Sequence, residues 1–141
     1  MNVPLPAGTG DRVYEYVFES IVEPVLADYD PDILLISAGQ DPGTVDPLGR
    51  NVVTKDGFED LGRWARELAE ACADGNLALI QERGYQLSHL GYATLGVLEG
   101  VLDVETGIDD PMAWMNEDYA SARRSVDETA DFYSEYWPAL E

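Results

Sequence analysis

The sequence contains few of the features that anchor many folds and sites. Its 141 residues include a single cysteine, Cys72, so the chain cannot form an internal disulfide bond. No apolar run approaches the length needed to span a bilayer, and the N-terminus lacks the basic and then apolar pattern of an export signal. Together these absences predict a soluble protein of the cytoplasm.

Positive charge is also scarce. The chain has 28 acidic residues against 8 basic ones, Lys55 is its only lysine, and the formal net charge is -20. Phosphates of nucleic acids and anionic membranes repel such a chain, so we expect neither as a partner. Because 45% of the residues are hydrophobic, we expect a folded domain and not a disordered acidic tail. Acidity spread along a whole chain is typical of a protein from a salt-rich cytoplasm.

The spacing of apolar residues predicts helices alternating with strands. Apolar residues at helical spacing follow Asp11, a residue suited to capping a helix N-terminus, whereas short continuous apolar runs indicate strands covered on both faces. The predicted helices cover residues 11–26, 58–68, 90–102 and 111–137, and the predicted strands cover residues 33–38 and 77–80. This order predicts an α/β fold with a parallel sheet and right-handed crossovers.

Three loops are expected at the carboxyl edge of that sheet, where parallel sheets bind their ligands. Residues 8–11, 39–53 and 82–85 each follow a segment predicted to be extended, which brings Asp41 and Tyr85 towards one pocket. Taken alone, Asp41 is consistent with a metal ligand, a phosphate acceptor or a turn residue before proline. Tyr85 is consistent with a phenol that hydrogen-bonds an oxyanion or with a packing aromatic residue.

Four short stretches of the sequence are informative only when they are considered together. They are Asn2-Val3-Pro4-Leu5-Pro6 with Gly8-Thr9-Gly10-Asp11, Pro31-Asp32 with Ser37-Ala38-Gly39-Gln40-Asp41, Asp46-Pro47-Leu48-Gly49, and Glu82-Arg83-Gly84-Tyr85. As a set, in this order, they resemble the C-terminal part of the zinc-dependent histone deacetylase and acetylpolyamine amidohydrolase family. The resemblance implies that residues 1–102 are the C-terminal part of a three-layer α/β/α domain of the arginase/deacetylase type. Residues 103–141 would then be an acidic loop and a helix packed on it.

The resemblance also implies an enzyme that removes acetyl groups from acetyl-lysine or acetylpolyamine amines. In this family two carboxylates and one imidazole hold a zinc ion, and Asp41 matches one of those carboxylates. Tyr85 matches the tyrosine that donates to the oxyanion, and Leu48 matches a residue at the rim of the substrate channel. The family usually has two glycines before this tyrosine. Gly84 matches the second, which also borders the channel, and Arg83 stands at the position of the first.

The other zinc ligands and the paired catalytic histidines of the family have no match in this sequence. Catalytic zinc takes three protein ligands, and Asp41 is only one. His89 lies outside the family motifs, and we interpret it as a surface or core-edge residue and not as a ligand. We therefore expect the chain to be a portion of a split or larger deacetylase, inactive alone, that binds a complementary N-terminal chain or a second copy of itself.

Two other functions fit parts of the pattern. The chain could be a non-catalytic interaction subunit or remnant of a deacetylase, folded through an exposed sheet edge and holding no metal. It could also be a receiver-like signalling domain in which Asp41 accepts phosphate. That chemistry requires an acidic cluster and a lysine at a later strand end, and Lys55 is badly placed for it.

Overall fold

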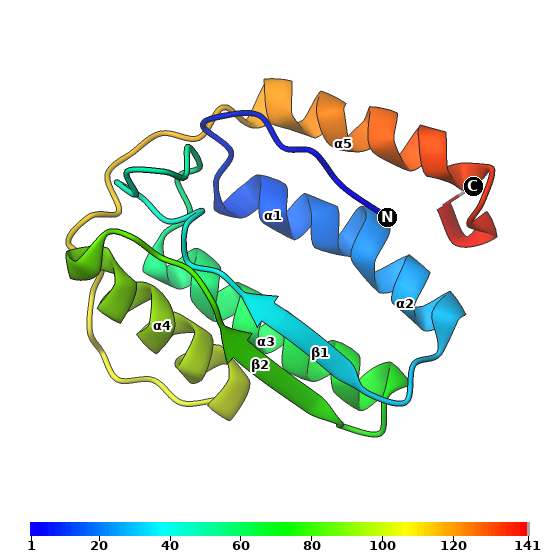
Figure 1. The fold of residues 1–141 in the computed structure, drawn as a ribbon, viewed down its shortest axis with the longest axis horizontal. Coiled ribbons are helices and arrows are strands. Elements are labelled where there is room, and N and C mark those ends of the chain that lie inside the picture. Colours follow the sequence, from blue (N-terminus) through cyan, green and yellow to red (C-terminus); the bar gives the residue numbers. More distant parts are fainter. Residues whose placement is uncertain (141) are drawn as a thin grey trace.

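The structure is a computed structural model that describes residues 1–140 and alternates helices with two short strands (Figure 1). Its elements are α1 (Asp11–Val17), a π-helical turn (Phe18–Val22), α2 (Glu23–Tyr29), β1 (Leu34–Ala38), α3 (Lys55–Cys72), β2 (Leu77–Gln81), α4 (Leu87–Leu102), α5 (Tyr119–Ser134) and a 3-10 turn (Pro138–Leu140). The predicted strands and the first three predicted helices are confirmed, with shifts at their ends. No helix within these residues has both the length and the apolarity needed to cross a membrane.

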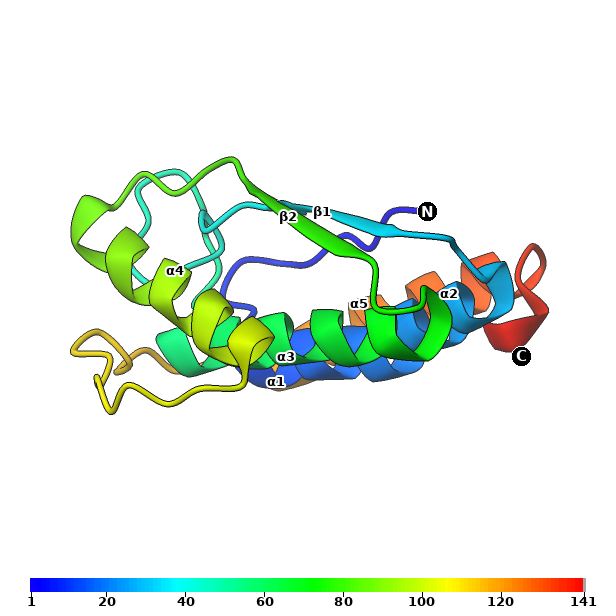
Figure 2. The same cartoon turned by 90° about the horizontal axis from the view of Figure 1, so that it is seen from below.

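The two strands form a parallel sheet in which Leu34 pairs with Leu77 and Ala38 pairs with Gln81. Figure 2 shows α1, α3 and α5 on one side of the strands and no helix of residues 1–140 over the opposite side. Leu35 is accordingly 66% exposed, although it is an apolar residue of β1. The prediction of strands covered on both faces is therefore wrong for the described part of the chain, which supplies a cover for one face only.

Clusters of buried apolar side chains join the helices to the strands and to one another. Leu34 of β1 packs with Leu68 and Ala69 of α3, which fixes the sheet on that helix. Val13 of α1 packs with Val126 of α5, so the last helix lies along the first one, as Figure 1 shows. Burial of these surfaces is the main source of stability for the arrangement.

The last helix begins later than the sequence predicted. It starts at Tyr119 and not at Pro111, and residues 111–114 form a turn instead. Two carboxylates account for this boundary. Asp110 accepts a hydrogen bond from the N–H of Met112 at 2.8 Å, which holds a turn there, and Asp118 accepts one from Ser121, which caps α5.

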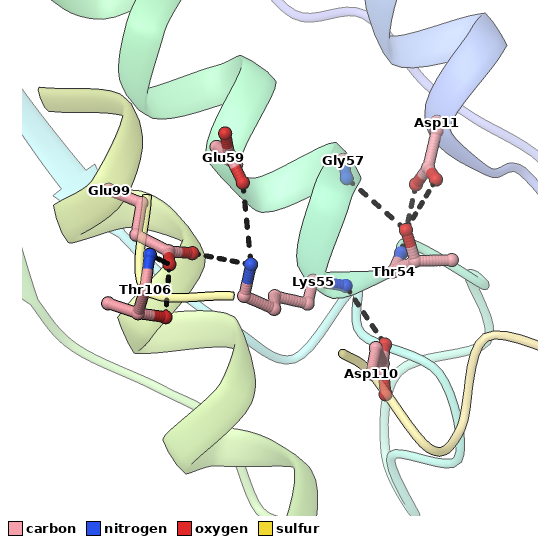
Figure 3. Close-up of polar contacts among 8 residues, drawn as sticks. All are labelled: Asp11, Thr54, Lys55, Gly57, Glu59, Glu99, Thr106 and Asp110. Atoms are coloured by element: carbon pink, nitrogen blue, oxygen red, sulfur yellow. Dashed lines mark hydrogen bonds and ion pairs between the residues drawn. The ribbon is translucent and has the colours of Figure 1, made fainter. Parts of the chain in front are cut away.

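Asp11 does not cap the helix that it begins, contrary to the expectation from the sequence, and binds the cap residue of α3 instead. The N-cap position of α1 is Gly10, and the carboxylate of Asp11 instead accepts hydrogen bonds from the N–H and the hydroxyl of Thr54, at 2.9 and 2.6 Å (Figure 3). The Thr54 hydroxyl oxygen in turn accepts from the N–H of Gly57 and caps α3. Burial raises the pKa of Asp11, although the bonds from Thr54 oppose that rise.

Glycines let α3 and α4 approach backbone to backbone. A Cβ added at Gly62 of α3 would overlap the carbonyl oxygen of Val97. One added at Gly100 of α4 would overlap the carbonyl oxygen of Glu59, and Gly96 faces α3 in the same way. Side chains at these positions would separate the two helices.

Replacing Gly100 with alanine should therefore destabilise the protein. We expect a loss of about 1–3 kcal/mol in the free energy of unfolding, measured by urea titration, because the added methyl group has no space. Gly91→Ala is the matched control on the same helix, since nothing lies within 4 Å of a Cβ at that position. It should be neutral or stabilising by up to about 1 kcal/mol. Equal effects of the two variants would contradict the close helix contact.

Candidate functional site

The loops that follow β1 and β2 leave the sheet at the same end (Figure 1). The strands are parallel, so their last residues, Ala38 and Gln81, are paired. The loop before α1 joins them, since the N–H of Val52 donates to the carbonyl oxygen of Thr9 at 2.8 Å. Residues 2–5 are not part of the sheet, contrary to the expectation that a strand precedes this first loop. The three predicted loops nevertheless lie together.

Asp46 links the loop after β1 to the loop after β2. Its Oδ1 accepts hydrogen bonds from the N–H groups of Leu48 and Gly49, at 2.8 and 2.9 Å. Its Oδ2 accepts from the N–H groups of Tyr85 and Gln86, at 2.8 and 3.3 Å. Burial acts to raise the pKa of Asp46, but the four N–H donors outweigh it and hold the pKa below its usual value. An ionised carboxylate therefore fixes one loop to the other.

Asp41 lies three residues after the end of β1, in a turn that depends on small residues. Its Oδ1 is 2.6 Å from the position that a Cβ on Gly39 would occupy, and a Cβ on Gly49 would overlap its backbone carbonyl group. Tyr14 of α1 is close by. Burial raises the pKa of Tyr14, a 2.9 Å hydrogen bond from Asn51 opposes the rise, and the negative charge of Asp41 adds to it. The sequence predicted Tyr14 only as part of an apolar helix face and did not identify Asn51.

The other predicted site residues lie on the tips of these two loops. Tyr85 and Leu48 are 47% and 67% exposed. Gly84 has φ of +135°, a backbone conformation that favours glycine, and a Cβ there would press on the side chains of Leu90 and Gln40. The carbonyl oxygen of Arg83 accepts a hydrogen bond from the N–H of Gln40 at 2.8 Å. The backbone before Tyr85 is thus tied to the loop after β1 despite the bulk of Arg83.

A largely apolar cavity of about 510 Å³ opens beside β1, between that strand, the α1–α2 segment and α3. Its wall is formed by Tyr14, Phe18, Val22, Leu26, Leu34, Leu35, Ile36, Ser37, Ala38, Gly39, Gln40, Pro42, Phe58, Leu61, Gly62, Ala65, Leu68, Leu79 and Val97. None of the four predicted site residues is in this wall. The cavity therefore reaches the base of the loop after β1 but does not bring Asp41 and Tyr85 together.

His89 is buried in the core and does not lie at the surface. Its side chain is 2% exposed, and its Nε2 lies 3.3 Å from Oδ2 of Asp110, whose side chain is equally buried. The interpretation of His89 as a surface or core-edge residue is corrected by this position inside the core. Its ring is 6.4 Å from the ring of Phe58, between α4 and α3.

Lys55, the only lysine, is held in a buried ion-pair network at the start of α3. Its Nζ contacts the carboxylate of Glu99 and lies 3.4 Å from that of Glu59 (Figure 3). Burial acts to lower the pKa of Lys55, but these two carboxylates outweigh it and raise the pKa. Because its amine is paired at this position, Lys55 does not serve a phosphate-accepting Asp41, and the receiver-like alternative loses its support.

The described residues do not make a complete metal site. Within residues 1–140, no three histidine, cysteine or acidic side chains gather so that they could hold a metal ion. Catalytic zinc takes three protein ligands. Asp41 is thus at most one ligand, and these residues alone do not fit zinc.

The fold and its edge loops define a parallel α/β protein whose candidate site lies at the carboxyl ends of the strands. The family model of the histone deacetylase domain matches residues 1–101. Curated relatives include histone deacetylase 8 of Arabidopsis thaliana, 38% identical over 99% of this chain, and a probable deacetylase of Archaeoglobus fulgidus, 32% identical over 97%. Similar solved structures include the histone deacetylase Clr3 (TM-score 0.83, 25% identity, all of this chain) and the HD domain of HDA15 (TM-score 0.79, 29% identity, 99%).

The chain therefore belongs to the histone deacetylase domain family, a family of zinc-dependent hydrolases, and shares its parallel α/β fold. It corresponds to only part of its relatives. The matches cover 37% of the Arabidopsis protein and 41% of the Archaeoglobus protein, and 23% and 37% of the two solved chains.

The link through Asp46 can be tested with Asp46→Asn. Asparagine keeps one carbonyl oxygen, so it cannot accept both from its own turn and from Tyr85 and Gln86. We expect a loss of about 1–3 kcal/mol in unfolding free energy at pH 7 and faster amide hydrogen exchange at Tyr85 and Gln86. Asp32→Asn, at an exposed position at the other end of β1, is the control.

The pH dependence gives a second test of the same link. Folding lowers the pKa of Asp46, so its stabilisation is complete above the unfolded value of about 3.9 and is lost as the pH falls through the lower folded value. The stability difference between wild type and Asp46→Asn should therefore shrink below that pH. A difference that stays constant into strong acid would contradict the ionised link.

Proposed function

We propose that this chain supplies part of the catalytic domain of a zinc-dependent deacetylase that hydrolyses acetylated amines. One observation carries the proposal: in a chain of this family, Asp46 fastens the loop with Asp41 to the loop with Tyr85 at the ligand-binding edge of a parallel sheet. The substrate class is acetyl-lysine or an acetylated polyamine, and the products are the free amine and acetate.

Each predicted residue has a role in this proposal. Asp41 provides one carboxylate ligand for zinc, and the bound metal would polarise the acetyl carbonyl group. Tyr85 donates its phenolic O–H to the substrate oxygen as that oxygen gains negative charge. Leu48 and Gly84 border the substrate channel, where an exposed apolar side chain and a residue without a side chain suit an aliphatic amine chain.

The remaining ligands come, in this proposal, from a complementary polypeptide. Apolar Leu35 and Ile80 lie exposed on the bare side of the sheet, and an apolar cavity opens beside β1. Free strand edges present unpaired N–H and C=O groups that another strand can bind. A net charge of -20 opposes association with a second copy, so a different chain is the preferred partner.

A chimera tests the function directly. In it, this chain replaces the matching region of Arabidopsis histone deacetylase 8, and deacetylation of an acetyl-lysine peptide and of an acetylated polyamine is measured. We expect activity in the chimera and its loss, together with zinc, in Asp41→Asn. Tyr85→Phe should keep zinc and lose about 100-fold or more in turnover, the usual effect of removing an oxyanion donor.

Asp32→Asn is the control for the chimera and should leave both activity and zinc unchanged. A folded chimera that holds no zinc and cleaves neither substrate would overturn the proposal. Zinc and activity that are unaffected by Asp41→Asn would remove Asp41 from the ligand set.

Arg83→Gly in the active chimera tests whether this side chain disturbs Tyr85. The backbone on both sides of residue 84 is held by Gln40 and Asp46, so we expect turnover to change less than twofold. A sharp rise in turnover would show that Arg83 displaces the Tyr85 hydroxyl group.

A further inference from the structure

The segment between α4 and α5, residues 103–118, lies outside residues 1–101 that the family model matches. It is rich in acidic residues and mostly exposed. Two of its carboxylates nevertheless face inward and bind backbone groups close to the candidate site. We call this segment the acidic brace, and its two anchors are Asp110 and Glu117.

Asp110 is the first anchor. Its side chain is 2% exposed, its Oδ2 accepts a hydrogen bond from the N–H of Lys55 at the start of α3 (2.9 Å, Figure 3), and its Oδ1 accepts from Met112. His89 places Nε2 3.3 Å from the same Oδ2. Burial acts to raise the pKa of Asp110, but these donors outweigh it and lower the pKa. An ionised carboxylate thus fixes the orientation of a buried imidazole.

His89 carries this contact to the turn that contains Asp41. Its Nδ1 lies 2.6 Å from the position that a Cβ on Gly43 would occupy, so the imidazole packs against the Cα atom of Gly43. Gly43 is two residues after Asp41, and its N–H donates to the carbonyl oxygen of Gln40 at 3.1 Å. Movement of the imidazole would therefore disturb the turn that positions the Asp41 carboxylate.

Glu117 is the second anchor. Its Oε1 accepts hydrogen bonds from the N–H groups of Gly10 and Val13, at 3.3 and 2.8 Å, and so caps the N-terminus of α1. The loop that ends at Gly10 accepts a hydrogen bond from Val52, near the end of the loop after β1. Through Glu117 the acidic brace is therefore bound to the start of α1, next to the loop that contacts the loop after β1.

We propose that the acidic brace holds the candidate site in shape, with Asp110 and His89 as positioning residues for the Asp41 turn. In this proposal Asp110 orients the imidazole of His89, the imidazole supports the backbone at Gly43, and that backbone positions Asp41. Neither Asp110 nor His89 touches the substrate in this scheme. Outer residues of this kind orient metal ligands and affect affinity for the metal. The importance of the turn for catalysis rests on the proposed function. The contact from Asp110 through His89 to the turn involves only residues of this chain.

Amide hydrogen exchange on the full chain tests the link without metal or activity. The readout is the exchange rate of the N–H groups of Gly43, Thr44 and Asp46, which donate hydrogen bonds to the carbonyl oxygens of Gln40, Val53 and Gly43. Asp110→Ala and His89→Leu should each accelerate exchange there about tenfold or more, since each removes a hydrogen bond involving a charged group. His89→Gln keeps an N–H donor near the position of Nε2 and should restore most of the protection.

Two control variants separate positioning from general stability. Asp109→Ala removes an exposed carboxylate next to Asp110 and should leave the turn unchanged. Val126→Ala weakens the α1–α5 core and should lower stability without selective exchange at the turn. The proposal is overturned if Asp110→Ala leaves the turn protected, or if Val126→Ala opens it to the same extent. Because the measurement needs no turnover, failure of the chimera and failure of the brace are distinguishable.

Discussion

Parallel pairing of β1 with β2 brings the carboxyl ends of both strands side by side, and the candidate site depends on that placement. Once the strand ends are adjacent, a single carboxylate, Asp46, can reach the backbone of both following loops. The strands in turn keep their position because Leu34 is buried against α3. The site is thus held by one sheet contact, one apolar cluster and one ionised side chain.

Charge is distributed unevenly between the surface and the interior. The surface carries most of a net charge of -20, while the only lysine is buried and pairs with the buried Glu99 and the partly exposed Glu59. A buried ion pair is weak evidence for stability, but loss of one partner would leave an uncompensated charge. Two other carboxylates, the partly exposed Asp46 and the buried Asp110, bind backbone N–H groups instead. Acidic residues therefore stabilise contacts between loops in addition to giving the surface its negative charge.

Local patterns in the sequence predicted most of the fold, because helical spacing and short apolar runs depend on neighbouring residues alone. Contacts between distant residues were not predictable in this way. Asp11 was expected to cap its own helix, but it binds Thr54. His89 looked peripheral because its partner, Asp110, is 21 residues away. The uncovered face of the sheet was not predictable for the same reason. Apolar strands indicate that both faces are covered, but they do not indicate which polypeptide provides the cover.

The candidate site was predictable to the extent that its motifs are local. Asp41, Tyr85, Leu48 and Gly84 lie on the two edge loops where the sequence placed them, and their catalytic roles stay predictions. The supporting groups around them required the structure. Tyr14, for example, is one residue of an apolar helix stripe in the sequence, yet its hydroxyl group lies near Asp41 and Asn51.

The most direct measurement is the zinc content of the chain by mass spectrometry, taken alone and after mixing with a polypeptide that carries the remaining ligands. A suitable polypeptide is the part of the Archaeoglobus deacetylase that this chain does not match. The account predicts about one zinc ion per complex, little zinc in either part alone, and loss of zinc from the complex with Asp41→Asn. A stable complex that holds no zinc would contradict the claim that this chain completes a deacetylase metal site.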